Sequence, residues 1–171
     1  MADGSNLTLQ FKPRARIIRT IGDQLISGPE AAVIELVKNA YDADASFVWI
    51  RFTPPLVAGS GRITIKDDGH GMSLSDVQDK WMEPATSSKS GQRFSRNLRR
   101  PLMGSKGIGR FAAAKLGRKM GLNSVSGAEG ARQEVLIPEI DWSIFDGDAY
   151  LADIAIDYLA QATPGPTGTE I

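Results

Sequence analysis

The feature that most constrains the fold is a change of hydrophobic period near residue 45. Residues 29–44 place apolar side chains at helical spacing and begin with Pro29, which is favoured at a helix N-terminus. Residues 46–52, SFVWIRF, alternate apolar and polar side chains, as a strand with one buried face does. Since a helix and a strand this close must share one core, the pattern predicts a helix packed on a sheet.

The same reading extends along the chain. Further helices are expected at 17–26, 76–82 and 109–120, with Gly121 ending the last one, and strands at 62–66, 122–126, 132–137 and 152–162. One more strand should begin in the final residues, PGPTGTEI. Helices mixed with strands in this way predict an α+β two-layer sandwich in a single domain over residues 1–171.

Composition narrows the class of protein. The 171 residues include no cysteine, so disulfides and thiolate metal sites are excluded. The N-terminus lacks the apolar core of a signal peptide, and apolar runs elsewhere are too short to span a membrane. A cytoplasmic location with no membrane partner is therefore expected.

Charge is neutral overall but unevenly distributed. Residues 84–128 contain ten Lys and Arg and no Asp or Glu. Such a segment is typical of a partner rich in phosphates, either a nucleotide or a nucleic acid, or of a plain solvated surface. Its first part, residues 84–106, has weak periodicity and predicts a long, mobile loop, and loops of that length are usually functional.

The helix at 29–44 carries an unusual polar row. Glu35, Asn39 and Asp42 are spaced i, i+4 and i+7, which stacks them on one face. Asn39 offers the hard oxygen that Mg²⁺ prefers alongside phosphates and water, and Glu35 lies one turn away as a candidate general base. Polar residues on a wet helix face are the alternative.

Two glycine-containing segments add chemistry. In DDGHGM, Asp67 ends a predicted strand and could accept a hydrogen bond from an amino group lying on Gly69 and Gly71, although Asp and Gly are also common in plain turns. GSKGIGRF, from Gly104 to Phe111, runs into a predicted helix and could bind an anion there. It is not a P-loop, and the dinucleotide fingerprint that it matches needs a preceding strand, which the sequence does not predict.

Together these segments resemble the boxes of the GHKL superfamily of ATP-binding domains, which includes gyrase, Hsp90, histidine kinases and MutL. ELVKNAYDADA resembles the first box, DDGHGM the second, PATSSK the start of the lid, GSKGIGRFA the third and TGTEI the last. The resemblance implies the Bergerat fold, with a mixed, mostly antiparallel sheet covered by helices on one face. It also implies that residues 84–106 are an ATP lid.

The resemblance assigns roles residue by residue. Glu35 takes the base position, Asn39 the magnesium position, and Asp67 and Thr169 the adenine-reading positions. The remaining positions expected to contact the nucleotide are Asp42, Gly69, Gly71, Met72, Thr86, Ser87, Ser88, Gly104, Ser105, Lys106, Gly107, Ile108, Gly109, Arg110 and Phe111. ATP and Mg²⁺ are the implied ligands.

A carboxylate at Glu35 suits hydrolysis by water better than transfer to a histidine, so the MutL- and Hsp90-like ATPases are the nearest group. Mg-dependent ATP binding with slow hydrolysis, acting as a conformational switch, is the expected function. The alternative is a regulatory nucleotide-binding module or a histidine-kinase-like catalytic domain without hydrolysis. Related ATPases complete the site with a lysine from a second domain, so a longer chain with a downstream domain and a nucleotide-dependent homodimer are expected. Nucleic acid is a further possible partner.

Overall fold

The computed structural model describes residues 8–57, 59–83, 93–104 and 111–171. Its strands form one six-stranded sheet in the order β1-β2-β6-β3-β4-β5, and each pair of neighbours is antiparallel. The strands are β1 (Val48–Thr53), β2 (Arg62–Asp67), β3 (Lys119–Ser126), β4 (Gln133–Asp141), β5 (Leu159–Ala162) and β6 (Gly168–Glu170).

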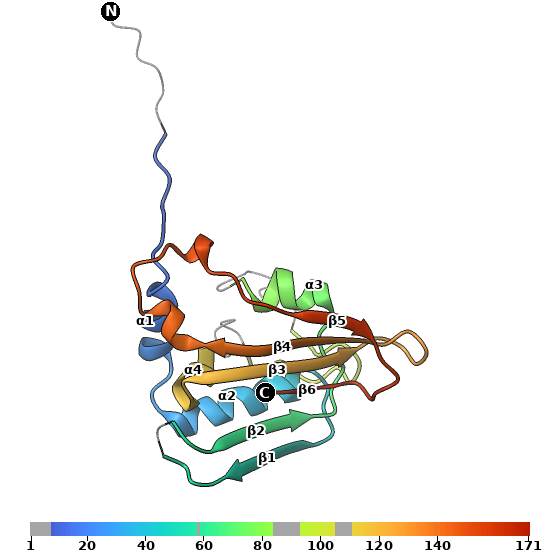
Figure 1. Cartoon of the computed structure of the whole chain (residues 1–171). Helices are drawn as coiled ribbons and strands as arrows, with labels where there is room; N and C mark the ends of the chain where they lie inside the picture. Colours follow the sequence, from blue (N-terminus) through green and yellow to red (C-terminus); the bar gives the residue numbers. More distant parts are fainter. Residues whose placement is uncertain (1–7, 58, 84–92, 105–110) are drawn as a thin grey trace, which may run out of the picture.

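The helices lie on one face of this sheet, and α2 and α4 run behind it in Figure 1. They are α1 (Ile17–Leu25), α2 (Pro29–Asp42), α3 (Leu74–Asp76) with the π-helical turn η1 (Val77–Trp81), α4 (Ala112–Leu116) and the 3-10 turns η4 (Trp142–Phe145) and η5 (Leu151–Asp153). The predicted α+β two-layer fold is confirmed. Among the helices that the structure describes, none has both the length and the apolar character to cross a membrane.

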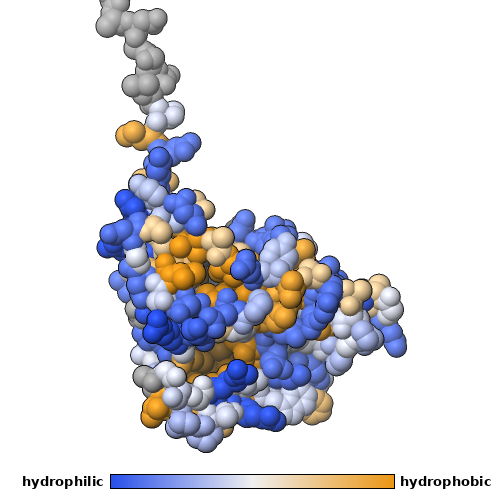
Figure 2. Space-filling view, viewed as in Figure 1, coloured by the Kyte–Doolittle hydropathy of each residue, from blue (hydrophilic) through white to orange (hydrophobic). Residues whose placement is uncertain are grey.

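The core lies between the helices and the inner face of the sheet. Alternate residues of β3 and β4, including Leu122, Val135 and Ile137, turn inward and pack against the small side chains of α2 and α4. The outward face carries polar pairs instead, such as Lys66 with Glu170 at 3.1 Å. Figure 2 shows this face with hydrophilic and hydrophobic residues interspersed.

The centre of the sheet depends on a very short strand. β6 has three residues, yet it pairs with β2 on one side, at Lys66 and Glu170, and with β3 on the other. The ladder between β6 and β3 places Thr169 opposite Ser124. β6 therefore brings together residues that are far apart in sequence, since it pairs with β2 and with β3.

The predicted helix at 109–120 is wrong beyond residue 116. Its described part, α4, ends at Leu116, because Gly117 adopts an extended conformation, and β3 begins at Lys119. Met120 is consequently an inward-facing strand residue, and Gly121 lies within β3 rather than ending a helix. The alternation of buried and exposed positions from Lys119 onward favours the strand over the helix.

Two strand predictions also need correction. The strand expected at 132–137 continues to Asp141, since a bulge opposite Met120 and Leu122 accommodates Pro138. The strand expected at 152–162 is confined to Leu159–Ala162. Ile154 and Ile156, which suggested a longer strand, pack against the core from an irregular segment.

Leu122→Ala should lower the free energy of unfolding by about 2–5 kcal/mol, because it opens a cavity under the central strands. Leu122 is 1% exposed, whereas Leu159 in β5 is 61% exposed, so Leu159→Ala is the matched control with an expected loss of about 0.5 kcal/mol. Urea titrations measure both values. Similar losses for the two variants would contradict the placement of the core.

Candidate functional site

The three polar residues on α2, which are Glu35, Asn39 and Asp42, lie in different environments. Glu35 is half-buried, and its Oε1 accepts a hydrogen bond from Lys38 Nζ at 2.8 Å. Asn39 is also half-buried, and no described residue bonds its carboxamide. Asp42 is 8% exposed and lies among protein groups. Of the three, Asn39 is the one whose side chain makes no hydrogen bond to a residue that the structure describes.

Asp42 holds the start of the glycine-rich segment. Its Oδ1 accepts from the backbone N–H of Met103 at 2.8 Å, and its Oδ2 accepts from that of Gly104 at 3.1 Å. Because both oxygens bond the protein backbone, Asp42 positions Gly104 in this structure. Direct contact of Asp42 with a nucleotide stays a prediction.

Asp44 anchors the preceding loop in a similar way. Its carboxylate accepts from the backbone N–H of Asn97 at 2.6 Å and of Leu98 at 3.2 Å. Burial alone would raise the pKa of Asp44, but hydrogen bonds from Ser95, Asn97 and Leu98 outweigh it and lower the pKa below the ordinary value. Asp44 adopts a left-handed backbone conformation with φ of 63°, which turns the chain directly after α2.

Arg100 ties the same loop to α2 from the other side. Its Nη1 donates to the carbonyl of Ala45 at 2.7 Å, and its guanidinium lies 5.0 Å from the ring centroid of Tyr41. Ser95 is fully buried and accepts from the backbone N–H of Arg100 at 2.8 Å. We call Asp42, Asp44, Ser95 and Arg100 the loop anchor. Sequence analysis missed Asp44, Ser95 and Arg100, because no local pattern pairs them.

The turn DDGHGM lies on the end of α2. The backbone N–H of His70 donates to the carbonyl of Ala43 at 2.9 Å, and Asp68 Oδ1 accepts from Ser46 and Phe47 at 2.7 and 2.8 Å. Gly71 has φ of 66°, and a Cβ there would lie 1.9 Å from the carbonyl oxygen of Val125. Only glycine fits this position, so the turn is pressed against β3.

Asp67 has one fixed oxygen and one open oxygen. Its Oδ1 accepts from the backbone N–H of Gly69 at 2.8 Å and of Thr169 at 3.3 Å. No described residue donates to Oδ2. Burial raises the pKa of Asp67, against the lowering effect of the two backbone donors. The geometry leaves one acceptor available for a ligand donor.

Met72 and Thr169 share a contact with the hydroxyl of Ser124. The backbone N–H of Met72 donates to Ser124 Oγ at 2.8 Å, and Thr169 Oγ1 lies 2.9 Å from the same oxygen. The second and last boxes therefore meet at β3. Sequence analysis did not single out Ser124, which carries no motif.

The segments predicted to bind phosphate are described only in part. Thr86, Ser87 and Ser88, and the run from Ser105 to Arg110, lie outside the described residues, so their predicted contacts stay predictions. Phe111 is 6% exposed and packs in the core, so its side chain does not face a ligand. The loop at 93–104 forms a single isolated bridge between Phe94 and Pro101.

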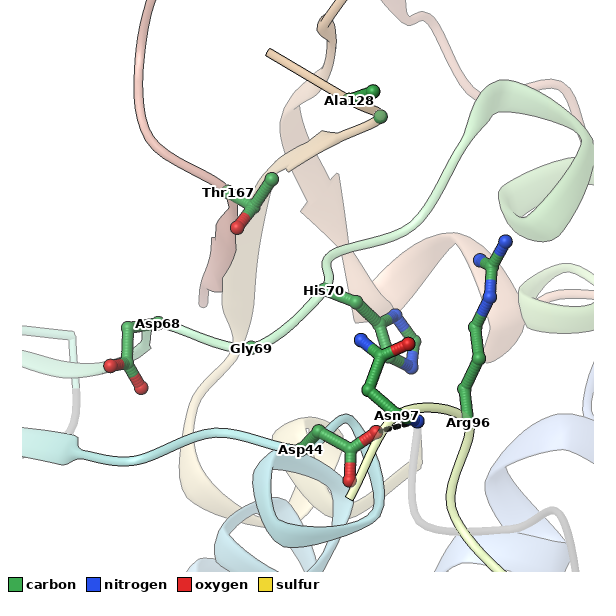
Figure 3. A pocket seen from close by; sticks show the side chains of 9 residues that line it. Asp44, Asp68, Gly69, His70, Arg96, Asn97, Ala128 and Thr167 are labelled. Carbon is green, nitrogen blue, oxygen red and sulfur yellow. Dashed lines mark hydrogen bonds between the residues drawn. The ribbon is translucent and has the colours of Figure 1, made fainter. Parts of the chain in front are cut away.

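A cavity of about 370 Å³ lies next to the turn (Figure 3). Its lining residues come from the turn, the loop anchor region and two loops at the ends of β3 and β6: Asp44, Asp68, Gly69, His70, Arg96, Asn97, Gly127, Ala128 and Thr167. Among the predicted site residues that the structure describes, only Gly69 lines it. The hydrogen bonds around Asp67, not this cavity, define the candidate site.

In the part of the chain that the structure describes, no three His, Cys, Asp or Glu side chains group together as a metal site would require.

The fold and this site define a two-layer α+β domain with the GHKL architecture. Residues 26–154 match the family described as histidine kinase-, DNA gyrase B- and HSP90-like ATPase. Since this match covers most of the chain, the protein belongs to that family, and the resemblance found in the sequence is confirmed.

The curated relatives include DNA mismatch repair proteins MutL. The protein from Rhodospirillum rubrum is 34% identical over 85 residues, which are 50% of this chain and 13% of that protein. The protein from Wolbachia sp. subsp. Brugia malayi is 39% identical over 74 residues, 43% of this chain and 11% of that protein. The protein from Azorhizobium caulinodans is 38% identical over 73 residues, which are 42% of this chain and 11% of that protein. The matches thus cover a small part of each relative's length.

Asp44→Gly should free the loop at 93–104, because glycine keeps the left-handed turn while the carboxylate is lost. Losing hydrogen bonds to a charged group, worth about 1.5–3 kcal/mol each, should speed local opening about tenfold or more. Trypsin cleavage after Arg96 and Arg99, followed by mass spectrometry, measures this. The control is Asp157→Gly at an exposed carboxylate outside the described contacts. Unchanged cleavage in Asp44→Gly would show that Asp44 does not anchor the loop.

Proposed function

We propose that this domain binds an adenine nucleotide with Mg²⁺ and hydrolyses ATP slowly, acting as a nucleotide-driven conformational switch. The observation that carries the proposal is Asp67, whose carboxylate is half-buried with Oδ1 fixed and Oδ2 open. No described residue donates to Oδ2, so a ligand amino group there would form a charge-assisted hydrogen bond with the carboxylate. Membership of an ATPase family supports adenine as the base that supplies this group.

The turn after Asp67 is closely packed against the rest of the protein. Gly71 has no room for a side chain, and Gly69 lies close enough to Ala43 that a Cβ would meet its carbonyl at 2.7 Å. The backbone of this turn is therefore compact on the side that faces α2. Thr169 adds a hydroxyl next to the carboxylate, where a second polar group of the base would be bound.

Asn39 fits the metal. Its carboxamide is half-buried on the same helix as Glu35 and is not bonded by any described side chain or backbone group. Mg²⁺ binds proteins through one or two oxygen ligands and completes its shell with phosphates and water. Bound there, the ion would neutralise phosphate charge, and Asn39 would hold it one helical turn from Glu35.

Glu35 would act as the general base. It would accept a proton from the water that attacks the γ-phosphorus, while the bond from that phosphorus to the β,γ-bridging oxygen breaks and ADP leaves. Its bond to Lys38 fixes the orientation of the carboxylate on α2. The same pairing means that Glu35 must share its oxygens between Lys38 and the water.

The switch would act through the loop anchor. α2 carries Glu35 and Asn39 near its middle, and Asp42 at its end holds Gly104. Movement of the segment at 84–106 over a bound nucleotide would therefore change the hydrogen bond between Gly104 and Asp42 at the end of the same helix. A downstream domain, a second copy of the chain and nucleic acid are proposed partners, and the name of the MutL relatives supports the last of these.

Asp67→Asn should weaken ATP binding and favour GTP relative to ATP. Oδ1 must still accept from Gly69 and Thr169, so the new NH₂ takes the place of Oδ2 and meets the adenine amino group donor to donor. The loss of a hydrogen bond to a charged group should cost about 1.5–3 kcal/mol. Titration calorimetry with Mg·ATP and Mg·GTP measures it, with Asp157→Asn as the control. Equal affinities in variant and wild type would remove Asp67 from the site.

Glu35→Gln should lower the rate of phosphate release by about 10²–10⁴ while ATP binding is retained, because only the proton acceptor is lost. Glu30→Gln, the same change at an exposed position of α2, is the control. Single-turnover assays on the 171-residue chain are sensitive enough for slow hydrolysis. A wild type that binds ATP without releasing phosphate would instead be a nucleotide-binding module, and a fully active Glu35→Gln would exclude Glu35 as the base.

A further inference from the structure

The hydroxyl of Ser124 is enclosed between the two segments that form the candidate base site. Ser124 is 0% exposed in the middle of β3. Its Oγ accepts from the backbone N–H of Met72 at 2.8 Å, lies 2.9 Å from Thr169 Oγ1 and lies 3.3 Å from the carbonyl oxygen of Gly168. One oxygen therefore connects the turn DDGHGM, strand β3 and strand β6.

Counting donors and acceptors leaves two acceptors for the single proton of this hydroxyl, and the distances favour one of them. A serine hydroxyl donates one hydrogen bond and accepts two. Met72 donates to it, which leaves the proton to point at Thr169 or at Gly168. The distance to Thr169 is close to the usual length for two hydroxyls, whereas the distance to Gly168 is long. Gly168 is also a ladder partner of Val125, so it does not depend on Ser124.

This placement determines what Thr169 offers to a ligand. If Ser124 donates to Thr169 Oγ1, the proton of the Thr169 hydroxyl remains available for another acceptor. Asp67, which is joined to Thr169 by the bond from the Thr169 backbone N–H to Oδ1 at 3.3 Å, has in Oδ2 an acceptor to which no described residue donates. The site then presents an acceptor on Asp67 and a donor on Thr169. Adenine presents the complementary pair, with its amino group as donor and ring N1 as acceptor, whereas guanine presents the reverse, with O6 as acceptor and N1–H as donor.

We propose that Ser124 is a positioning residue that orients the Thr169 hydroxyl as a donor, and that this orientation selects adenine over guanine. The inference rests on the proposed function, because it concerns the same base site. Ser124 would not touch the nucleotide. Its effect would pass through Thr169, while its bond to Met72 keeps the turn at the correct distance.

Ser124→Ala should reduce the preference for ATP over GTP, because Thr169 is then free to rotate and can accept as well as donate. The net contribution of one hydrogen bond corresponds to about 2- to 12-fold in an equilibrium constant. The dissociation constant for GTP divided by that for ATP should therefore decrease by about 2- to 12-fold. Calorimetry with Mg·ATP and Mg·GTP gives the ratio. Ser126→Ala is the matched control, since Ser126 lies on the same inward face of β3 and its hydroxyl has no bond to a described residue.

A purely structural role would give a different result. Loosening of the turn at Met72 would weaken both nucleotides and leave their ratio unchanged. If Ser124→Ala is unstable, Ser124→Cys keeps a similar volume with a weak donor, and it should lower the same ratio. Thr169→Val removes the hydroxyl through which Ser124 acts. In that background Ser124→Ala should no longer change the ratio, which a double-mutant cycle measures.

The outcomes separate the two proposals. A wild-type chain that binds neither nucleotide overturns the proposed function and this inference with it. A wild type that prefers ATP, with the same ratio in Ser124→Ala and Ser124→Cys, overturns the inference alone. The inference is also overturned if Ser124→Ala still lowers the ratio when it is added to Thr169→Val. Ser124 would then act by another route.

Discussion

The site depends on the insertion of β6 between β2 and β3. A strand of three residues has few ladder hydrogen bonds of its own, and it is held because both neighbours pair with it. This insertion brings the backbone N–H of Thr169 to Asp67 and the hydroxyl of Thr169 to Ser124. Asp67 would otherwise end an edge strand, and its carboxylate would be more hydrated. The pairing encloses Ser124, whereas burial raises the pKa of Asp67 against the lowering effect of the donors Gly69 and Thr169.

The end of α2 has a second organising role. The sequence YDADA places two carboxylates two residues apart, and both bond backbone N–H groups of the loop at 93–104. Carboxylates that accept backbone hydrogen bonds are well stabilised in the ionised form, which agrees with the lowered pKa of Asp44. The helix that carries Glu35 and Asn39 is thereby coupled to the start of the glycine-rich segment. Movement of Met103 and Gly104 away from Asp42 would break these bonds.

The outcome of the sequence predictions follows from how local each signal is. Helix α2 and strands β1 and β2 were predicted closely, because their periodicity and their proline and glycine boundaries lie within each segment. The helix at 109–120 was predicted too long, because AAAKLGRKM has high helix propensity on both sides of Gly117. The order of the sheet, with β6 at its centre, has no local signal at all. Asp44, Ser95, Arg100 and Ser124 were missed for the same reason, since each acts on a residue far away in sequence.

The sequence by itself determined the fold class, the family and the residue types of the site. Four short segments in a fixed order identify a GHKL domain, and the spacing of Glu35 and Asn39 follows directly from helix geometry. The tertiary structure alone decided what each side chain bonds. In the folded chain Asp42 accepts hydrogen bonds from the backbone of Met103 and Gly104. One oxygen of Asp67 has no donor among the described residues, and Phe111 is buried in the core. The reason is that a hydrogen bond depends on distances of about 3 Å between atoms, and such distances are determined only when distant segments pack together.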